Sequence, residues 1–166
     1  AGRAGHVCVG VVSTGKYFAP GLIVRARAAM PEIEFTLKIG NRAQIIAALE
    51  ERTIDVAIMG RAPREPAVIA EPLGAHPYVL VAPPDHLLAR ARAASVDEVL
   101  AQTFLCREPG SGTRLLTEHY LEQLGAGRGY DTIEIGSNET IKQGVIAGLG
   151  VAIISAHTIA AELASG

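Results

Sequence analysis

The chain has 166 residues, of which 49% are hydrophobic, enough for one sizeable core or for two smaller lobes. Its formal net charge is −2, aromatic residues make up only 4%, and Trp is absent, which argues against a nucleic-acid-binding surface built on basic residues and stacked bases. No apolar run reaches membrane-spanning length, and no signal-peptide pattern is present.

Residues 7–60 alternate between strand-type and helix-type segments. Apolar, β-branched runs predict buried strands at 7–12 and 54–60, and the alternating pattern of 34–40 predicts a half-covered strand near a sheet edge. After the first strand, helical spacing places one apolar set on a common face, and a second helix follows the turn at 40–42. That set is Phe18, Leu22, Ala26, Ala29 and Met30. The order predicts an α/β fold with parallel strands joined by right-handed crossovers.

The character of the sequence changes after residue 62. Six of the nine prolines lie between Pro63 and Pro84, in a segment with little helical periodicity and one short apolar strand at 78–82. Extended, proline-rich segments make semi-rigid connections, so we expect a crossing between two lobes here. Two short helical pieces follow, and Ser95 with Glu98 has the spacing of a capping box.

The second half of the chain repeats the pattern of the first. A strand at 104–108 leads through a turn of small residues, 109–114, into a helix that ends at Gly125. Leu115, Leu116, His119, Tyr120 and Leu124 continue that helix. A strand at 133–136, a helix capped at 137–138, a strand at 151–154 and a last helix at 157–163 complete the order.

The turn after the first strand combines small residues with a cation. Residues 13–15 precede a helix, whose unpaired N–H groups attract an anion, and Lys16 adds a full charge. The spacing from Gly10 to Lys16 nearly matches a nucleotide-binding P-loop. However, Tyr17 stands where that motif needs Ser or Thr, the first Gly falls inside the strand, and no Asp ends the run 56–59. We therefore expect a ligand-binding turn and not an NTPase.

Hydrogen-bond donors and cations gather at strand ends and at turns into helices. These residues are Ser13, Thr14, Lys16, Asn41, Arg61, Ser111, Thr113, Arg114 and Asn138. Ser, Thr and Asn can simply cap helices there, and for Thr113 and Asn138 we leave capping and ligand contact open as equal alternatives. Arg61 follows an apolar strand, and Lys16 and Arg114 stand at helix starts where the dipole disfavours a cation, which favours a ligand. Two lobes whose helix N-termini face one cleft would form a site for a small anion.

The sequence contains no catalytic set and no metal-binding pattern. The turn at 110–112 matches neither the nucleophile elbow nor the dinucleotide fingerprint, and the five histidines lack metal-ligand spacing. We therefore expect no enzyme, no cofactor and no metal. Cys8 and Cys106 lie in apolar, strand-like runs and predict buried, reduced thiols in a cytoplasmic protein, with a disulfide as the alternative.

Several phrases together resemble one known family. They are residues 10–13 (GVVS), 40–42 (GNR), 54–61 (IDVAIMGR), 107–114 (REPGSGTR), 136–143 (GSNETIKQ) and 148–151 (GLGV). Over nearly its whole length the chain resembles the effector-binding domain of LysR-type transcriptional regulators. Within that family it is similar to the regulators of carbon-fixation operons.

The resemblance implies two Rossmann-like lobes of the periplasmic-binding-protein type (type 2), lobe I at 1–76 and lobe II at 77–166. It implies a cleft that senses a phosphorylated metabolite or NADPH. The implied contacts are Ser13, Thr14, Asn41, Arg61, the turn that contains Gly110, Ser111, Thr113 and Arg114, and the pair Ser137 and Asn138, to which the charge argument above adds Lys16. Homodimers or homotetramers are implied, with DNA bound only through a separate helix-turn-helix domain. That domain is absent from this sequence, and the family's return strands and last helix of lobe I are missing too, so we expect lobe I to be incomplete and the fold truncated at the C-terminus.

Two other interpretations stay open at this point. A solute-binding protein of a transport system would share the fold, although the missing export signal and the reduced-looking cysteines count against it. An enzyme acting on a phosphorylated substrate would need the acid–base or nucleophilic set that the sequence lacks.

Overall fold

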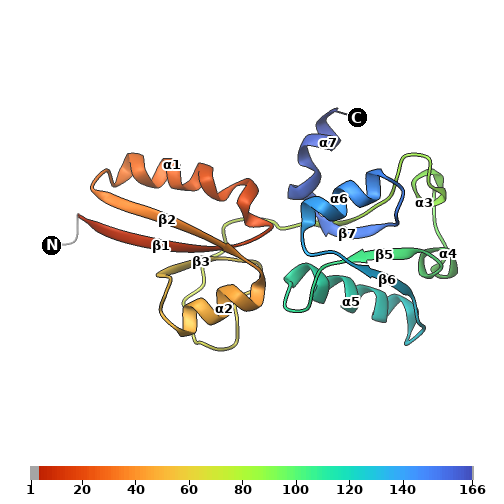
Figure 1. The fold of residues 1–166 in the computed structure, drawn as a ribbon, viewed down its shortest axis with the longest axis horizontal. Coiled ribbons are helices and arrows are strands. Elements are labelled where there is room, and N and C mark those ends of the chain that lie inside the picture. Colours follow the sequence, from red (N-terminus) through yellow and green to blue (C-terminus); the bar gives the residue numbers. More distant parts are fainter. Residues whose placement is uncertain (1–3, 166) are drawn as a thin grey trace. The chain divides into compact units, whose positions relative to one another are not determined.

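The computed structural model describes residues 4–165 and divides them into two compact units, one up to Ala75 and the other from His76. The first unit is a parallel three-stranded sheet with two helices (Figure 1). β1 (Gly5–Val12) lies between β2 (Ile33–Gly40) and β3 (Val56–Ile58). A 3-10 turn (Gly15–Tyr17) and α1 (Ala19–Ala29) connect β1 to β2, and α2 (Arg42–Glu50) connects β2 to β3. The parallel crossovers and the edge position of β2 confirm the sequence predictions.

α1 buries a narrower face than its spacing predicts. Ala19 and Ile23 pack in one apolar cluster with Val11 of β1. Ala29 and Met30, predicted on the same face, are exposed. The prediction is wrong for these two residues because the apolar cluster under the helix ends before its last turn.

The second unit contains two strand pairs. β5 (Thr103–Cys106) and β6 (Asp131–Glu134) are parallel, whereas β4 (Tyr78–Val81) and β7 (Ala152–Ser155) are antiparallel. A parallel bridge between Phe104 and Val151 links the pairs, with the Leu105 N–H donating to the Val151 carbonyl at 2.8 Å. Gly150 allows this approach, because a Cβ there would lie 2.4 Å from the Thr103 carbonyl oxygen.

Helices cover both faces of these strands (Figure 1). α4 (Val96–Leu100) and α5 (Gly112–Gly125) pack with Phe104 and Cys106, while α6 (Asn138–Ile146) packs with Leu105 on the other side. The alternation along β5 therefore sends successive side chains into two separate cores. The remaining elements are α3 (Leu87–Arg90), a 3-10 turn (Ala156–Ile159) and α7 (Ala160–Ser165).

α5 turns a different face inward from the one its leucines indicate. Its buried positions are Thr113, Thr117, Leu121 and Gly125, four residues apart, whereas Leu115, Leu116 and Tyr120 are exposed. The polar Thr117 is accommodated because its hydroxyl donates to the Thr113 carbonyl at 3.0 Å.

Cys8 and Cys106 are both buried and unbonded, which confirms the prediction of buried thiols. Among residues 4–165, no helix has the length and apolar character needed to cross a membrane.

Candidate functional site

The predicted residues of the first unit follow three parallel strands at one edge of the sheet. The last pair of β1 and β2 joins Val12 to Gly40, and the Ser13 N–H donates to the Gly40 carbonyl at 3.0 Å. By the register of the two strands, Ser13 and Asn41 therefore lie side by side, just past the carboxyl ends of β1 and β2. Arg61 follows β3 at the same edge, and its backbone carbonyl accepts a hydrogen bond from the Arg42 guanidinium.

Lys16 does not stand in the first turn of a helix that could hold an anion. It lies in the 3-10 turn, and α1 begins only at Ala19. The Lys16 Nζ lies 5.1 Å from the centre of the Tyr17 ring, which gives the ammonium a local partner. Thr14 beside this turn is buried but makes no capping hydrogen bond. The helix-dipole argument for Lys16 is therefore wrong, because a tight turn separates β1 from α1.

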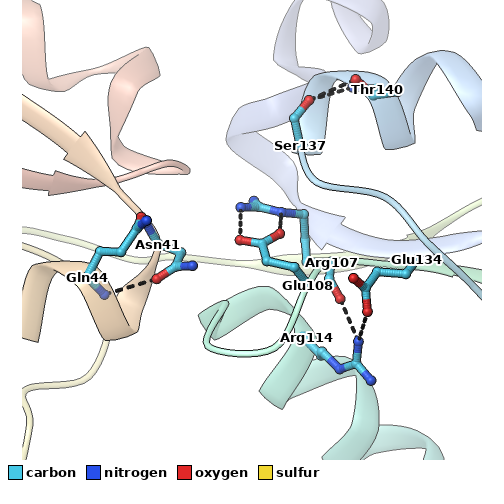
Figure 2. A network of polar contacts seen from close by, with 8 residues as sticks. All are labelled: Asn41, Gln44, Arg107, Glu108, Arg114, Glu134, Ser137 and Thr140. Atoms are coloured by element: carbon cyan, nitrogen blue, oxygen red, sulfur yellow. Dashed lines mark hydrogen bonds and ion pairs between the residues drawn. The ribbon is translucent and has the colours of Figure 1, made fainter.

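Asn41 is the N-cap of α2. Its side-chain oxygen accepts from the Gln44 N–H at 3.0 Å, and the Gln44 side chain accepts from the Asn41 N–H at 2.8 Å (Figure 2). This reciprocal pair is a capping box, which fixes the start of the helix. The cap uses the side-chain oxygen of Asn41, a residue that the sequence predicts to contact the ligand.

In the second unit, the turn after β5 begins with an ion pair between a buried arginine and a half-buried glutamate. Arg107 is 4% exposed, and its guanidinium donates to both carboxylate oxygens of Glu108, at 2.7 and 2.9 Å (Figure 2). The Glu108 carboxylate is therefore neutralised by its neighbour in the sequence. Sequence reasoning missed the burial of Arg107, although an Arg directly after a buried strand is a signal that could have indicated it.

Arg114 is held by partners within its own unit. Its Nε donates to Glu118 at 2.7 Å, and its Nη1 donates to Glu134 at 2.9 Å and to the Arg107 carbonyl at 3.0 Å (Figure 2). The hydrogen bond to Glu118 is the main reason why the pKa of Arg114 is raised. These contacts explain a cation in the first turn of α5 without a ligand, and they tie the turn to β6.

The other predicted residues of this turn are small and buried. Ser111 is the N-cap of α5 in extended conformation, but its side chain makes no capping bond. Thr113 occupies the second position of the helix and is also buried. Gly110 adopts a φ of 89°, a left-handed conformation that glycine reaches without strain. The structure thus decides against capping for Thr113.

In the turn after β6, Ser137 and Asn138 play different parts, although the sequence predicts them as one pair. Ser137 is the N-cap of α6, and its Oγ accepts from the Thr140 N–H at 3.0 Å (Figure 2). Asn138 is the first residue of the helix and is 2% exposed. Neither its Oδ1 nor its Nδ2 has a hydrogen-bond partner within the described part of the chain. Asn138 therefore does not cap the helix.

The turns after β5 and β6 lie at the same sheet edge, because these strands are parallel and Cys106 pairs with Glu134. Both helices that follow begin there, and their N-termini carry partial positive charge. Chemically, this edge offers hydroxyl and amide groups beside two helix starts, an arrangement that suits an anion with further polar groups. Within residues 4–165, no group of three or more His, Cys, Asp and Glu side chains is placed to hold a metal ion.

A polar cluster at the start of the second unit was not predicted. The His76 Nε2 lies 3.1 Å from the Ser155 Oγ, and its ring is 5.6 Å from the His157 ring and 4.9 Å from the Tyr78 ring. His76 and Tyr78 lie far in the sequence from Ser155 and His157, and the antiparallel pairing of β4 with β7 brings the two pairs together.

Comparisons with known proteins give one consistent result. A family model described as LysR substrate binding domain matches residues 1–166. The chain is 53% identical over 165 residues to the HTH-type transcriptional regulator CbbR of Cereibacter sphaeroides, covering 99% of this chain and 53% of the relative. It is 53% identical to CbbR of Xanthobacter flavus, covering 98% of this chain and 49% of that protein. The chain thus spans about half the length of these curated relatives.

Among solved structures, the regulatory domain of Synechocystis PCC6803 CcmR in complex with 2-PG resembles this fold, with a TM-score of 0.84 and 32% identity. The match covers 93% of this chain and 74% of that domain.

Proposed function

Because the chain belongs to the family of LysR substrate-binding domains, we propose that it binds a small phosphorylated metabolite and thereby controls transcription by the full-length protein. Both units are mixed α/β. The similarity to the CcmR regulatory domain confirms the predicted type 2 periplasmic-binding-protein fold. We take the two compact units as the two lobes of that fold.

One observation supports the ligand class above the others. At the carboxyl edge of β5 and β6, two helices of nine residues or more begin beside the buried side chains of Ser111, Thr113 and Asn138. Helix N-termini favour anions, and phosphate groups in particular. The 2-PG in the CcmR relative points to the same chemistry. A phosphorylated nicotinamide nucleotide such as NADPH belongs to the same class of ligand.

The first unit would contribute Ser13, Thr14, Asn41 and Arg61 at the carboxyl edge of its own sheet. In this proposal Arg61 supplies the charge, since Lys16 already stacks on Tyr17. Arg114 acts as a positioning residue, which holds the turn after β5 in place through its three contacts. In the whole protein, DNA would be bound through a separate domain, in the cytoplasm, by a homodimer or homotetramer.

The test is a calorimetric titration of the chain with organic phosphates, nicotinamide nucleotides and inorganic phosphate. Thr113→Val removes one buried hydroxyl without changing the shape of the side chain, and Arg61→Ala removes the proposed charge. We expect each to weaken binding of the best phosphate ligand about tenfold, the loss of one good hydrogen bond or ion contact.

Arg90→Ala is the matched control, because Arg90 is an exposed cation on α3 whose only recorded partner in the described residues is Asp85. Its removal should leave affinity unchanged. Absence of any saturable phosphate binding, or affinity that neither Thr113→Val nor Arg61→Ala alters, would refute the proposal.

A further inference from the structure

The side-chain amide of Asn138 is buried with both of its polar atoms unsatisfied. Oδ1 and Nδ2 each lack a partner in residues 4–165, and the residue is 2% exposed. Most buried polar side-chain atoms in proteins are hydrogen-bonded, because an unpaired one loses its interaction with water and gains nothing. The described part of the chain therefore leaves the hydrogen bonding of this amide incomplete.

The surroundings do not supply the missing partners. The Oγ of Ser137, one residue earlier, accepts a hydrogen bond from the Thr140 N–H and shares another with the Thr140 hydroxyl. The next inward-facing residues of α6, Ile141 and Val145, belong to an apolar core cluster. An apolar side chain of similar size at position 138 would leave nothing unpaired, so the amide has a use that packing does not explain.

The two unsatisfied atoms have opposite requirements. Nδ2 donates, and a phosphate oxygen at the N-terminus of α6 would satisfy it. Oδ1 accepts, and a phosphate monoester dianion has no proton to offer it. A ligand that completes Asn138 must therefore carry a donor next to its anionic group, and a hydroxyl is the simplest one.

We propose that Asn138 selects hydroxylated organic phosphates over phosphates that lack a hydroxyl, an inference that rests on the proposed phosphate-binding function. Because both amide atoms are covered by the surrounding chain, their pairing with a ligand accompanies a local rearrangement at the start of α6. The rearrangement is favoured only by a ligand that satisfies both atoms, which is the origin of the selectivity.

The test compares glycerol 3-phosphate with n-propyl phosphate, which have the same carbon chain length and charge and differ in their hydroxyl groups. Titrations at pH 8 keep both as dianions, since the second pKa of a phosphate monoester is about 6. We expect the wild-type chain to bind glycerol 3-phosphate at least about tenfold more tightly, the lower range for an unpaired buried group. In Asn138→Ala this preference should fall to about threefold or less.

Two further variants make the result specific. Asn138→Ser keeps one small donor and acceptor and should retain part of the preference. Thr158→Val is the matched control: the Thr158 hydroxyl is equally buried and unpartnered among the described residues, but it lies in the 3-10 turn after β7. It should leave the preference unchanged.

Equal affinity of the wild-type chain for the two phosphates would overturn the inference and leave the phosphate site standing. So would a preference that survives Asn138→Ala, or one that Thr158→Val abolishes. If the wild-type chain binds no organic phosphate at all, the proposed function itself is wrong and the selectivity falls with it.

Discussion

The guanidinium of Arg114 joins three parts of the second unit: its own helix through Glu118, the strand β6 through Glu134, and the preceding turn through the Arg107 carbonyl. The side chain is partly exposed, so each ion pair is weakened by solvent. We expect Arg114→Gln to lower the free energy of unfolding by about 1 kcal/mol, measured by urea denaturation. Arg90→Ala, which breaks an exposed pair, should change it by less than about 0.5 kcal/mol, and equal losses in the two variants would contradict the positioning role.

We expect His76 to make the stability of the second unit depend on pH. Burial, and to a lesser extent the neighbouring His157, lower the pKa of His76 from its ordinary value of 6.5. Its other close neighbours, Tyr78 and Ser155, carry no charge at neutral pH. Between the lowered pKa and 6.5 the unfolded chain binds more protons than the folded one, so stability falls as the pH decreases through this window.

In His76→Gln, which keeps a polar group near Ser155, this part of the pH dependence should be lost. Urea unfolding at several pH values between 8 and 5 measures it. A variant whose stability falls with pH as steeply as that of the wild type would rule out His76 as the source.

At the scale of elements, the start of α2 depends on a reciprocal cap. Asn41→Ala removes the acceptor for the Gln44 N–H and should lower the free energy of unfolding by about 1 kcal/mol. Asn41→Asp keeps the acceptor and should retain most of the stability. Thermal unfolding monitored by circular dichroism compares the two, and equal melting temperatures would argue against the cap.

The contact between β5 and β7 requires a glycine. In Gly150→Ala the new Cβ would meet the Thr103 carbonyl at 2.4 Å, and the backbone must shift at the bridge that joins the two strand pairs. We expect a loss of about 1–3 kcal/mol in unfolding free energy, the usual cost of overpacking. Gly129→Ala, where no heavy atom lies within 4 Å of the new Cβ, is the control and should change little. A loss of similar size at both positions would show that the close approach is unimportant.

Element types and their order followed from periodicity, because strands such as β1 and β2 carry clear apolar patterns. The inward face of α5 could not be predicted this way. Its leucines favour one side, but in the folded chain Thr113 and Thr117 are buried and Leu115 and Leu116 are exposed. Similarly, a Cβ at Gly15, in the 3-10 turn before α1, would lie 2.7 Å from the Val11 side chain, a close approach that spacing does not reveal.

The site could be predicted only in part for a related reason. Turns at the carboxyl ends of parallel strands are readable from the sequence, which predicts Ser111, Thr113 and Asn138 at such turns. Which side chains are already engaged is a property of the folded structure. Arg114 forms ion pairs with two glutamates, whereas the side-chain amide of Asn138 has no hydrogen-bond partner in the described residues.

At the scale of the whole molecule, the family membership and the two α/β units leave one central claim to test: a phosphorylated ligand binds where α5 and α6 begin. The most direct measurement is the change in backbone amide NMR shifts when the tightest-binding organic phosphate is added. The account predicts that, within the second unit, the largest changes fall on residues 110–114 and 137–139, with little change on α3. Largest changes on α3 or along the outer face of α5, or no changes at saturating phosphate, would contradict it.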